Sequence, residues 1–276
     1  MVGMPVVSLT SDIGQQDYLI GAVKGQLLSC NASLNIVDIT HYLSSSNYPQ
    51  AAYVCKNAFK HFPKQSLHIV LLNLFETKAD KMLLSVINDQ YLISPDNGIV
   101  TMIAAEKPQT IYEIDIRNNH TLLEITDTVA KAVNVVFSAG GIAGTGNEIN
   151  EIVEKYPLRP TIGPNWMEGQ ILFIDHFENV VINISKEEFE EHRQGRSFKL
   201  VFKRNEVIDT IYENYASVQE GEKLAFFNSA GYLEIAINKG NMAGLFGLQG
   251  FNERINMQNP AMQNKWFYQT VRVFFE

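Results

Sequence analysis

The chain has little cysteine: Cys30 and Cys55 are its only two thiols in 276 residues. Their spacing fits neither a metal site nor a redox motif, and no grouping of His, Cys and carboxylates has the spacing of metal ligands. Secreted domains that depend on disulfides are much richer in cysteine. We therefore expect a cytoplasmic protein with buried thiols and no metal.

Positive charge is also scarce. Lys and Arg together number 22 against 30 Asp and Glu, which gives a formal net charge of −8. The sequence contains no basic run and no patch in which Lys or Arg alternates with aromatic residues. Because nucleic-acid surfaces need such charge to neutralise phosphates, we expect no nucleic acid among the partners.

Long apolar runs are absent as well. Runs such as Leu67–Phe75 fall far short of the roughly 20 residues that a membrane-spanning helix needs. The N-terminus shows no charged segment followed by an apolar run, so we expect neither a signal peptide nor a membrane partner. Apolar residues still make up 46% of the chain, which is enough for a sizeable core.

The first half alternates strand-like and helix-like patterns. Leu67–Leu72 is an apolar run interrupted only by His68, which is typical of a strand buried on both faces. Alternating strands and helices indicate an α/β domain with a mostly parallel sheet and helices on both faces. The expected strands are Pro5–Thr10, Asn35–Thr40, Leu67–Leu72 and Gln90–Ser94, and the expected helices are Asp17–Cys30 and Tyr48–Phe62.

The second half changes character after a linker. Pro157–Pro164 holds three prolines and a glycine, a composition typical of a linker. Short alternating runs separated by turns follow and predict an all-β, barrel-like domain. We expect an α/β domain over residues 1–156 and a β domain over residues 163–276. The expected strands are Gly169–Asp175, Val180–Ile184, Ser197–Val201, Lys223–Phe227, Leu233–Ile237 and Val271–Phe275.

Asp12 is the first candidate for a ligand contact. It follows the first expected strand within Thr-Ser-Asp-Ile-Gly, so its carboxylate would lie at the carboxyl edge of the sheet, where open α/β folds bind ligands. The alternative is that Asp12 caps the next helix or stabilises a turn. The pattern alone favours this structural role.

Several motifs together resemble one family. Asn228–Ala243 contains Asn-Ser-Ala-Gly, Leu-Glu-Ile-Ala and Gly-Asn-Met-Ala, and Ile36–His41 reads Ile-Val-Asp-Ile-Thr-His. Pro95–Gly98 reads Pro-Asp-Asn-Gly, and Asp175–Asn179 reads Asp-His-Phe-Glu-Asn. In this order and spacing they resemble the S-adenosylmethionine (SAM) hydroxide adenosyltransferases, also called SAM hydrolases, which are related to fluorinase and chlorinase.

The resemblance implies a fold, an assembly and a ligand. The family has an α/β domain followed by a barrel-like domain, and it forms a homotrimer that binds SAM between one subunit's first domain and a neighbour's second. By this resemblance, Asp12 holds the ribose hydroxyls, Asp175 receives the methionine ammonium, Asn179 contacts adenine, Lys239 lies near adenine, and Ser229 holds the methionine end. The alternative for Asn179 and Ser229 is a purely structural role in turns.

The resemblance fails at the catalytic residues. The family's hydrolases attack C5′ of the ribose with water and expel methionine, using an Asp–Arg–His set. Asn73 falls at the Asp position, Asp80 at the Arg position and Glu124 at the His position. Asn cannot accept a proton, and the two acids reverse the local charge.

Two functions remain open from the sequence. The first is a weakened SAM hydrolase that releases adenosine and L-methionine without a cofactor; in it Glu124 or Glu76 would be the base if burial raised its pKa, and Lys78 or Lys81 the lost cation. The second is a protein that binds SAM or adenosine without turnover. A scaffold without any ligand is a third, less specific alternative.

Overall fold

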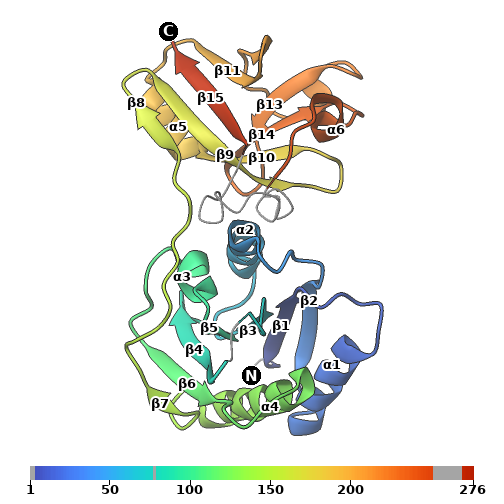
Figure 1. Cartoon of the computed structure of the whole chain (residues 1–276), viewed down its shortest axis with the longest axis vertical. Coiled ribbons are helices and arrows are strands. Elements are labelled where there is room, and N and C mark those ends of the chain that lie inside the picture. Colours follow the sequence, from blue (N-terminus) through green and yellow to red (C-terminus); the bar gives the residue numbers. More distant parts are fainter. Residues whose placement is uncertain (1–3, 77–78, 251–268) are drawn as a thin grey trace, which may run out of the picture. The chain divides into compact units, whose positions relative to one another are not determined.

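The computed structural model describes residues 4–76, 79–250 and 269–276. The chain divides into two compact units, residues 1–157 and residues 158–276 (Figure 1). Within the described ranges, no helix combines the length and the apolar character needed to cross a membrane.

The first unit is a seven-stranded sheet with helices on both faces. Its strands lie in the order β2-β1-β3-β5-β4-β6-β7. The strands are β1 (Val6–Ser11), β2 (Asn35–Thr40), β3 (Leu67–Leu71), β4 (Lys81–Ile87), β5 (Gln90–Pro95), β6 (Ile111–Asp115) and β7 (Asn147–Glu148). The helices are α1 (Leu19–Cys30), α2 (Tyr48–Phe59), α3 (Ile99–Ala104) and α4 (Leu122–Ala139).

The sheet is mixed. Strands β2, β1, β3 and β5 are parallel neighbours, whereas β4 runs antiparallel to β5 and β6, and β6 runs antiparallel to β7. Asn88 and Asp89, which join β4 to β5, have φ values of 51° and 61°, as a tight hairpin turn requires. The predicted parallel arrangement therefore holds for four strands only, because the hairpin reverses the chain direction.

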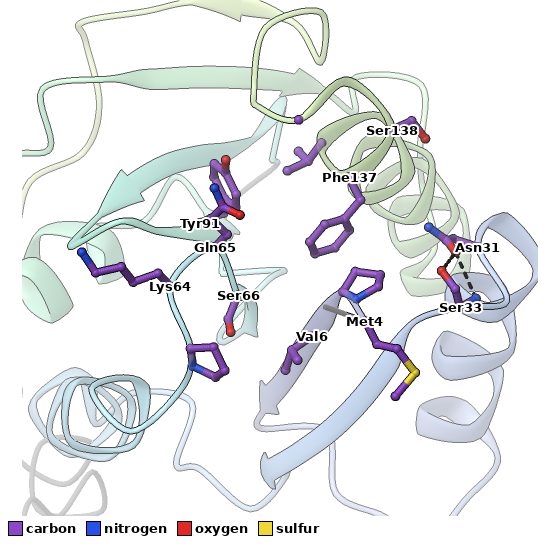
Figure 2. A pocket seen from close by; sticks show the side chains of 14 residues that line it. Met4, Val6, Asn31, Ser33, Lys64, Gln65, Ser66, Tyr91, Phe137 and Ser138 are labelled. Carbon is purple, nitrogen blue, oxygen red and sulfur yellow. Dashed lines mark hydrogen bonds between the residues drawn. The ribbon is translucent and has the colours of Figure 1, made fainter. Parts of the chain in front are cut away.

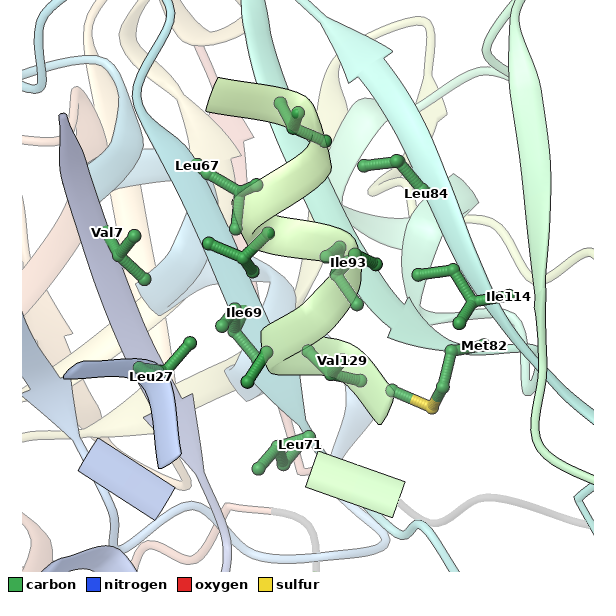
Figure 3. Close-up of a cluster of buried hydrophobic side chains, with 14 of the residues drawn as sticks. Val7, Leu27, Leu67, Ile69, Leu71, Met82, Leu84, Ile93, Ile114 and Val129 are labelled. Carbon is green, nitrogen blue, oxygen red and sulfur yellow. The ribbon is translucent and has the colours of Figure 1, made fainter. Parts of the chain in front are cut away.

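Two hydrophobic clusters cover the two faces of this sheet. On one face, Leu27 of α1 and Val129 of α4 belong to the same buried cluster as Leu67 and Ile69 of β3 (Figure 3). On the other face, α2 and α3 pack against Val70. Because neighbouring residues of a strand point to opposite faces, β3 must be apolar on both, and all five of its residues are buried.

The two thiols lie in this unit, in helices on opposite faces of the sheet. Cys55 is fully buried in the cluster under α2, and burial raises the pKa of its thiol to about 12. Cys30, at the end of α1, is only partly buried. The expectation of two buried thiols is thus correct for Cys55 and wrong for Cys30, which occupies the last turn of its helix.

The second unit is an antiparallel, barrel-like sheet of eight strands. Its strand order is β12-β11-β15-β9-β10-β14-β13, with β8 beside β9. A bridge between Ile211, which follows β12, and Ala225 of β13 joins the two edges and nearly closes the sheet. The elements are β8 (Thr161–Gly163), β9 (Trp166–Ile174), β10 (Val180–Ser185), α5 (Lys186–Arg193), β11 (Phe198–Lys203), β12 (Glu206–Ile208), the 3-10 helix η1 (Tyr215–Ser217), β13 (Lys223–Phe227), β14 (Tyr232–Ile237), α6 (Met242–Phe246) and β15 (Thr270–Phe275).

Aromatic packing fills the interior of the barrel. Phe189 of α5 is fully buried and meets Phe198, Phe227 and Phe275 edge-on at centroid distances of 5.2, 5.4 and 5.8 Å. Edge-to-face pairs of this kind add stability beyond the area they bury. The prediction of a β-barrel-like second domain is confirmed, and the core of that domain is independent of the first sheet.

Candidate functional site

The first candidate site lies at the carboxyl ends of β1 and β3. From β1 the chain passes through α1 on one face to β2, and it then returns through α2 on the opposite face to β3, on the other side of β1. The strand order thus reverses between β1 and β3. Such a switch point is where open α/β sheets bind ligands, in the crevice beyond the carboxyl ends of the strands.

Asp12 and Asn73 meet at this switch point. Asp12 directly follows β1, and its Oδ2 accepts a hydrogen bond of 2.8 Å from the backbone N–H of Asn73. The backbone N–H of Asp12 donates in turn to the carbonyl of Leu71 at the end of β3. Burial raises the pKa of the Asp12 carboxyl, while backbone N–H groups from Asn73 and Asp12 itself oppose the rise. A half-buried carboxylate can accept two hydroxyl hydrogen bonds at once, as a ribose diol requires.

A chain of hydrogen bonds leads away from Asn73. Asn73 has a left-handed backbone with φ of 50°, and its Nδ2 donates to the Tyr48 hydroxyl at 3.4 Å. The Tyr48 hydroxyl donates to Oε2 of Glu76 at 2.9 Å. Burial raises the pKa of Tyr48, and the nearby carboxylates of Glu76 and Asp12 add to the rise. The Tyr48 proton therefore stays in place to orient the Glu76 carboxylate.

A lysine completes this group. The Nζ of Lys155 lies 3.7 Å from the centroid of the Tyr48 ring. Burial lowers the pKa of Lys155, and the negative charge of Glu76 partly opposes this. A cation over an aromatic face is attracted by the ring, so Lys155 brings positive charge to the same edge of the sheet. No motif in the sequence pointed to this role of Lys155.

A cavity of about 150 Å³ adjoins the site, and Asn73, Glu76 and Asp80 are among its lining residues. Asp80 is exposed, and its backbone carbonyl accepts a hydrogen bond from Ile116. Lys81, a candidate for the lost cation, forms an ion pair of 3.3 Å with Asp96. The other candidate, Lys78, lies outside the described residues.

Glu124 has a structural role at the start of α4. Its Oε2 accepts backbone hydrogen bonds from His120 and Thr121 at 2.6 and 3.1 Å, and Thr121 caps the Glu124 N–H in return. These backbone donors lower the pKa of the exposed Glu124 carboxyl. The sequence-based hypothesis required burial with a raised pKa for Glu124 or Glu76. Glu124 shows neither, because a capping box favours the ionised form. Glu76 is exposed as well, so any role as a base would depend on its contacts and not on burial.

The second candidate site is a turn in the barrel-like unit. Between β9 and β10, Oδ1 of Asp175 accepts hydrogen bonds from the backbone N–H groups of Phe177 and Asn179, at 2.9 and 2.8 Å. Its Oδ2 accepts a bond of 3.1 Å from Nδ2 of Asn179. Asp175 and Asn179 are therefore held together, as both the ligand role and the structural alternative would require.

A partly buried network extends from this turn. Nδ2 of Asn179 also donates to the Tyr215 hydroxyl at 2.8 Å, and this hydroxyl donates to Oε1 of Glu234 at 2.9 Å. The other oxygen of Glu234 accepts from Nδ2 of Asn228 at 2.9 Å. Glu234 is 5% exposed, and burial raises its pKa. The sequence analysis assigned no role to this carboxyl, although a Glu within the apolar run of β14 was a detectable signal.

The two remaining candidates lie beyond the ends of β14. Ser229 is exposed in the turn before it, where Oδ1 of Asn228 accepts from the backbone N–H groups of Ala230 and Tyr232. Lys239 follows β14 with φ of 55°, and its Nζ forms an exposed ion pair with Glu220 at 2.9 Å. The network therefore connects the Ser229 turn, but not Lys239, to Asn179.

A larger cavity, of about 700 Å³, lies at the opposite edge of the first sheet (Figure 2). Val6, Ser66 and Tyr91 line it near the amino ends of β1, β3 and β5, together with Phe137 of α4. Among the described residues, its lining includes no Asp or Glu, so they offer no carboxylate to a ribose diol. None of the predicted site residues lies there.

Comparisons with known proteins agree with the motifs. Residues 7–146 match the SAM hydroxide adenosyltransferase N-terminal domain, and residues 169–254 match its C-terminal domain. The chain is 24% identical to the (R)-S-adenosyl-L-methionine hydrolase of Methanocaldococcus jannaschii, over 91% of this chain and 95% of that protein. It is 22% identical to the fluorinase of Actinopolyspora mzabensis, over 91% and 97%.

Solved structures show the same fold. An uncharacterized conserved protein from Thermotoga maritima superposes with a TM-score of 0.79 at 21% identity, covering 97% of this chain and 99% of the other. A conserved hypothetical protein from Thermus thermophilus gives a TM-score of 0.71, also at 21% identity, over 99% and 100%. With both domains matched in order over most of its length, the chain belongs to the SAM hydroxide adenosyltransferase family.

Proposed function

We propose that this protein binds SAM and hydrolyses it slowly to adenosine and L-methionine. The observation that carries the proposal is the half-buried Asp12 carboxylate at the switch point, fixed by the Asn73 N–H at 2.8 Å. Asp12 would hold the ribose hydroxyls. Asp175 would receive the methionine ammonium, Asn179 would contact adenine, and Ser229 and Lys239 would lie at the methionine and adenine ends of the ligand.

The chemistry needs a base but no acid. Water attacks C5′ while the C5′–S bond breaks, and the positively charged sulfonium leaves as a neutral thioether. The enzyme has to place one water in line and accept its proton. Asn73 has no basic atom, and Asp80 would put negative charge where the family's hydrolases place Arg. A low rate is the expected consequence.

Adenosine release, followed by chromatography, tests this function. We expect release that is about 10²–10⁴-fold slower than that of the M. jannaschii hydrolase under the same conditions, the range for losing a general base. Release at the rate of that relative would contradict the proposed defect. No release at all, together with no binding of SAM in calorimetry, would refute the function.

The second candidate function is binding of SAM or adenosine without turnover. It is favoured by Glu124, because the hydrogen bonds that lower its pKa make it a poor proton acceptor. Heat of binding with SAM, S-adenosylhomocysteine and adenosine, combined with no adenosine release over hours, would select this alternative.

A further inference from the structure

We propose that Glu76 is the general base of this reaction, with Tyr48 and Lys155 as the residues that position it. The proposal rests on the proposed SAM hydrolysis and names the residues that replace the Asp–Arg–His set. Glu76 would take the proton of the attacking water. Tyr48 would fix the direction of its carboxylate, and Lys155 would supply the positive charge.

The contacts of the described residues define the place of Glu76. Asp12 and Asn73 share a hydrogen bond, Asn73 contacts Tyr48, and the Tyr48 hydroxyl reaches Glu76, in three successive steps of 2.8, 3.4 and 2.9 Å. If Asp12 held the ribose hydroxyls, C5′ would be about one sugar ring away from the Asp12 carboxylate, on the side where a water could reach it. Glu76 also lines the cavity of about 150 Å³ beside Asn73, which offers room for a water.

Three other carboxylates near this edge are less suitable. Asp12 is assigned to the ribose, and Asp96 is held by Lys81 and by the backbone N–H of Val153. Glu124 caps α4 through its Oε2, and these bonds lower the pKa of its carboxyl. The Glu76 carboxylate instead accepts its hydrogen bond from Tyr48, a neighbour of Asn73, and so lies in the same network as Asp12.

The backbone of Lys155 is held in place by Thr101. Thr101 Oγ1 donates to the Lys155 carbonyl at 2.5 Å and accepts from its N–H at 2.9 Å. Gly98 leaves space for the Lys155 side chain, since a Cβ at this glycine would lie 2.6 Å from Lys155 Cγ. The ammonium lies over the Tyr48 ring, where it is attracted by the ring and by the charge of Glu76.

The proposed step is balanced. The water oxygen forms a bond to C5′ as the C5′–S bond breaks, and the electron pair of that bond goes to sulfur. One water proton passes to the Glu76 carboxylate, and the other remains on the new 5′-hydroxyl of adenosine. Methionine leaves as a neutral thioether, and Glu76 returns its proton to solvent before the next turnover.

Glu76→Gln tests the base. The amide still accepts a hydrogen bond from Tyr48 but cannot take a proton, so we expect adenosine release to fall by about 10²–10⁴-fold. Binding of SAM in calorimetry should stay within about twofold of the wild type, because the side chain is exposed and the ribose contact is on Asp12. Asp127→Asn is the matched control: it neutralises an exposed carboxylate of α4 paired with Lys131, and it should leave release unchanged.

The outcomes separate the two proposals. Wild-type release that Glu76→Gln does not slow overturns the assignment of the base and leaves SAM hydrolysis intact. If Glu124→Gln loses adenosine release and Glu76→Gln does not, the assignment of Glu76 is wrong and Glu124 is the base. A wild type that releases no adenosine overturns the hydrolysis and the base with it.

Lys155 and Tyr48 are tested by their kinetics. Lys155→Gln and Tyr48→Phe should each lower kcat while leaving KM near its wild-type value, and Lys155→Arg should restore part of the loss. A purely structural role predicts instead a lower melting temperature with unchanged kcat in the folded fraction. That result would remove the two residues from the proposal.

Discussion

At the residue scale, Asp12 is the position with the clearest expected effect. Asp12→Ala should weaken the binding of adenosine and SAM alike, by about 1.5–3 kcal/mol, the range for hydrogen bonds to a charged acceptor. Calorimetry with both ligands measures the loss. Unchanged affinity for adenosine would mean that the carboxylate only secures the Asn73 backbone.

Asp175 should discriminate between ligands. Asp175→Asn removes the charge that would meet the methionine ammonium, so SAM and S-adenosylhomocysteine should lose more affinity than adenosine. Because Asp175 also holds the turn through Phe177 and Asn179, a thermal melt of the variant is the necessary control. Equal losses for SAM and adenosine would refute the assignment of this carboxylate.

Glu234 should make stability depend on pH. Burial raises its pKa in the folded protein, so the folded state binds this proton more tightly than the unfolded state does. The contribution of Glu234 is therefore largest below its unfolded pKa and declines as pH rises through the folded value. Chemical denaturation of the wild type and of Glu234→Gln at several pH values measures this contribution. As the pH rises from about 4, just below the model-peptide pKa of Glu, the wild type should lose stability relative to the variant. A constant difference would contradict the raised pKa.

At the element scale, the start of α4 is fixed by its capping box. Thr121 caps Glu124, and Glu124 accepts from the Thr121 N–H. Thr121→Ala should cost about 0.5–2 kcal/mol of stability, as other cap deletions do. The measurement is urea denaturation, with Ser138→Ala at the exposed end of the same helix as the control. Equal stability of the two variants would mean that packing of α4, rather than the cap, sets its beginning.

At the scale of the whole molecule, the prediction is a homotrimer. It follows from the family resemblance, and light scattering at micromolar concentration should give about three times the chain mass of 31.1 kDa. A mass equal to one chain at that concentration would contradict it. If the trimer is found, dilution to nanomolar concentration tests whether ligand binding falls as the assembly dissociates.

The sequence by itself determined the family and the places of several strands and helices, but it missed others, such as β4 and α4. Strands such as Asn35–Thr40 and Lys223–Phe227 have the predicted bounds, because the apolar pattern of a strand is visible in a short window of sequence. The motifs likewise identified Asp12, Asp175 and Asn179 as candidates, since each is a local feature of the chain.

Only the tertiary structure decided which side chains meet. Tyr48, Glu76 and Lys155 are far apart in the chain, and only the crossing of α2 and the return of the chain after α4 bring them to one edge of the sheet. The structure also showed that the sheet is mixed, because the β4–β5 hairpin reverses the direction of the chain. Glu124 is a contrasting case. Its hydrogen-bond partners His120 and Thr121 lie within four residues of it, so the Thr-x-x-Glu pattern of a capping box could have predicted the helix cap from the sequence.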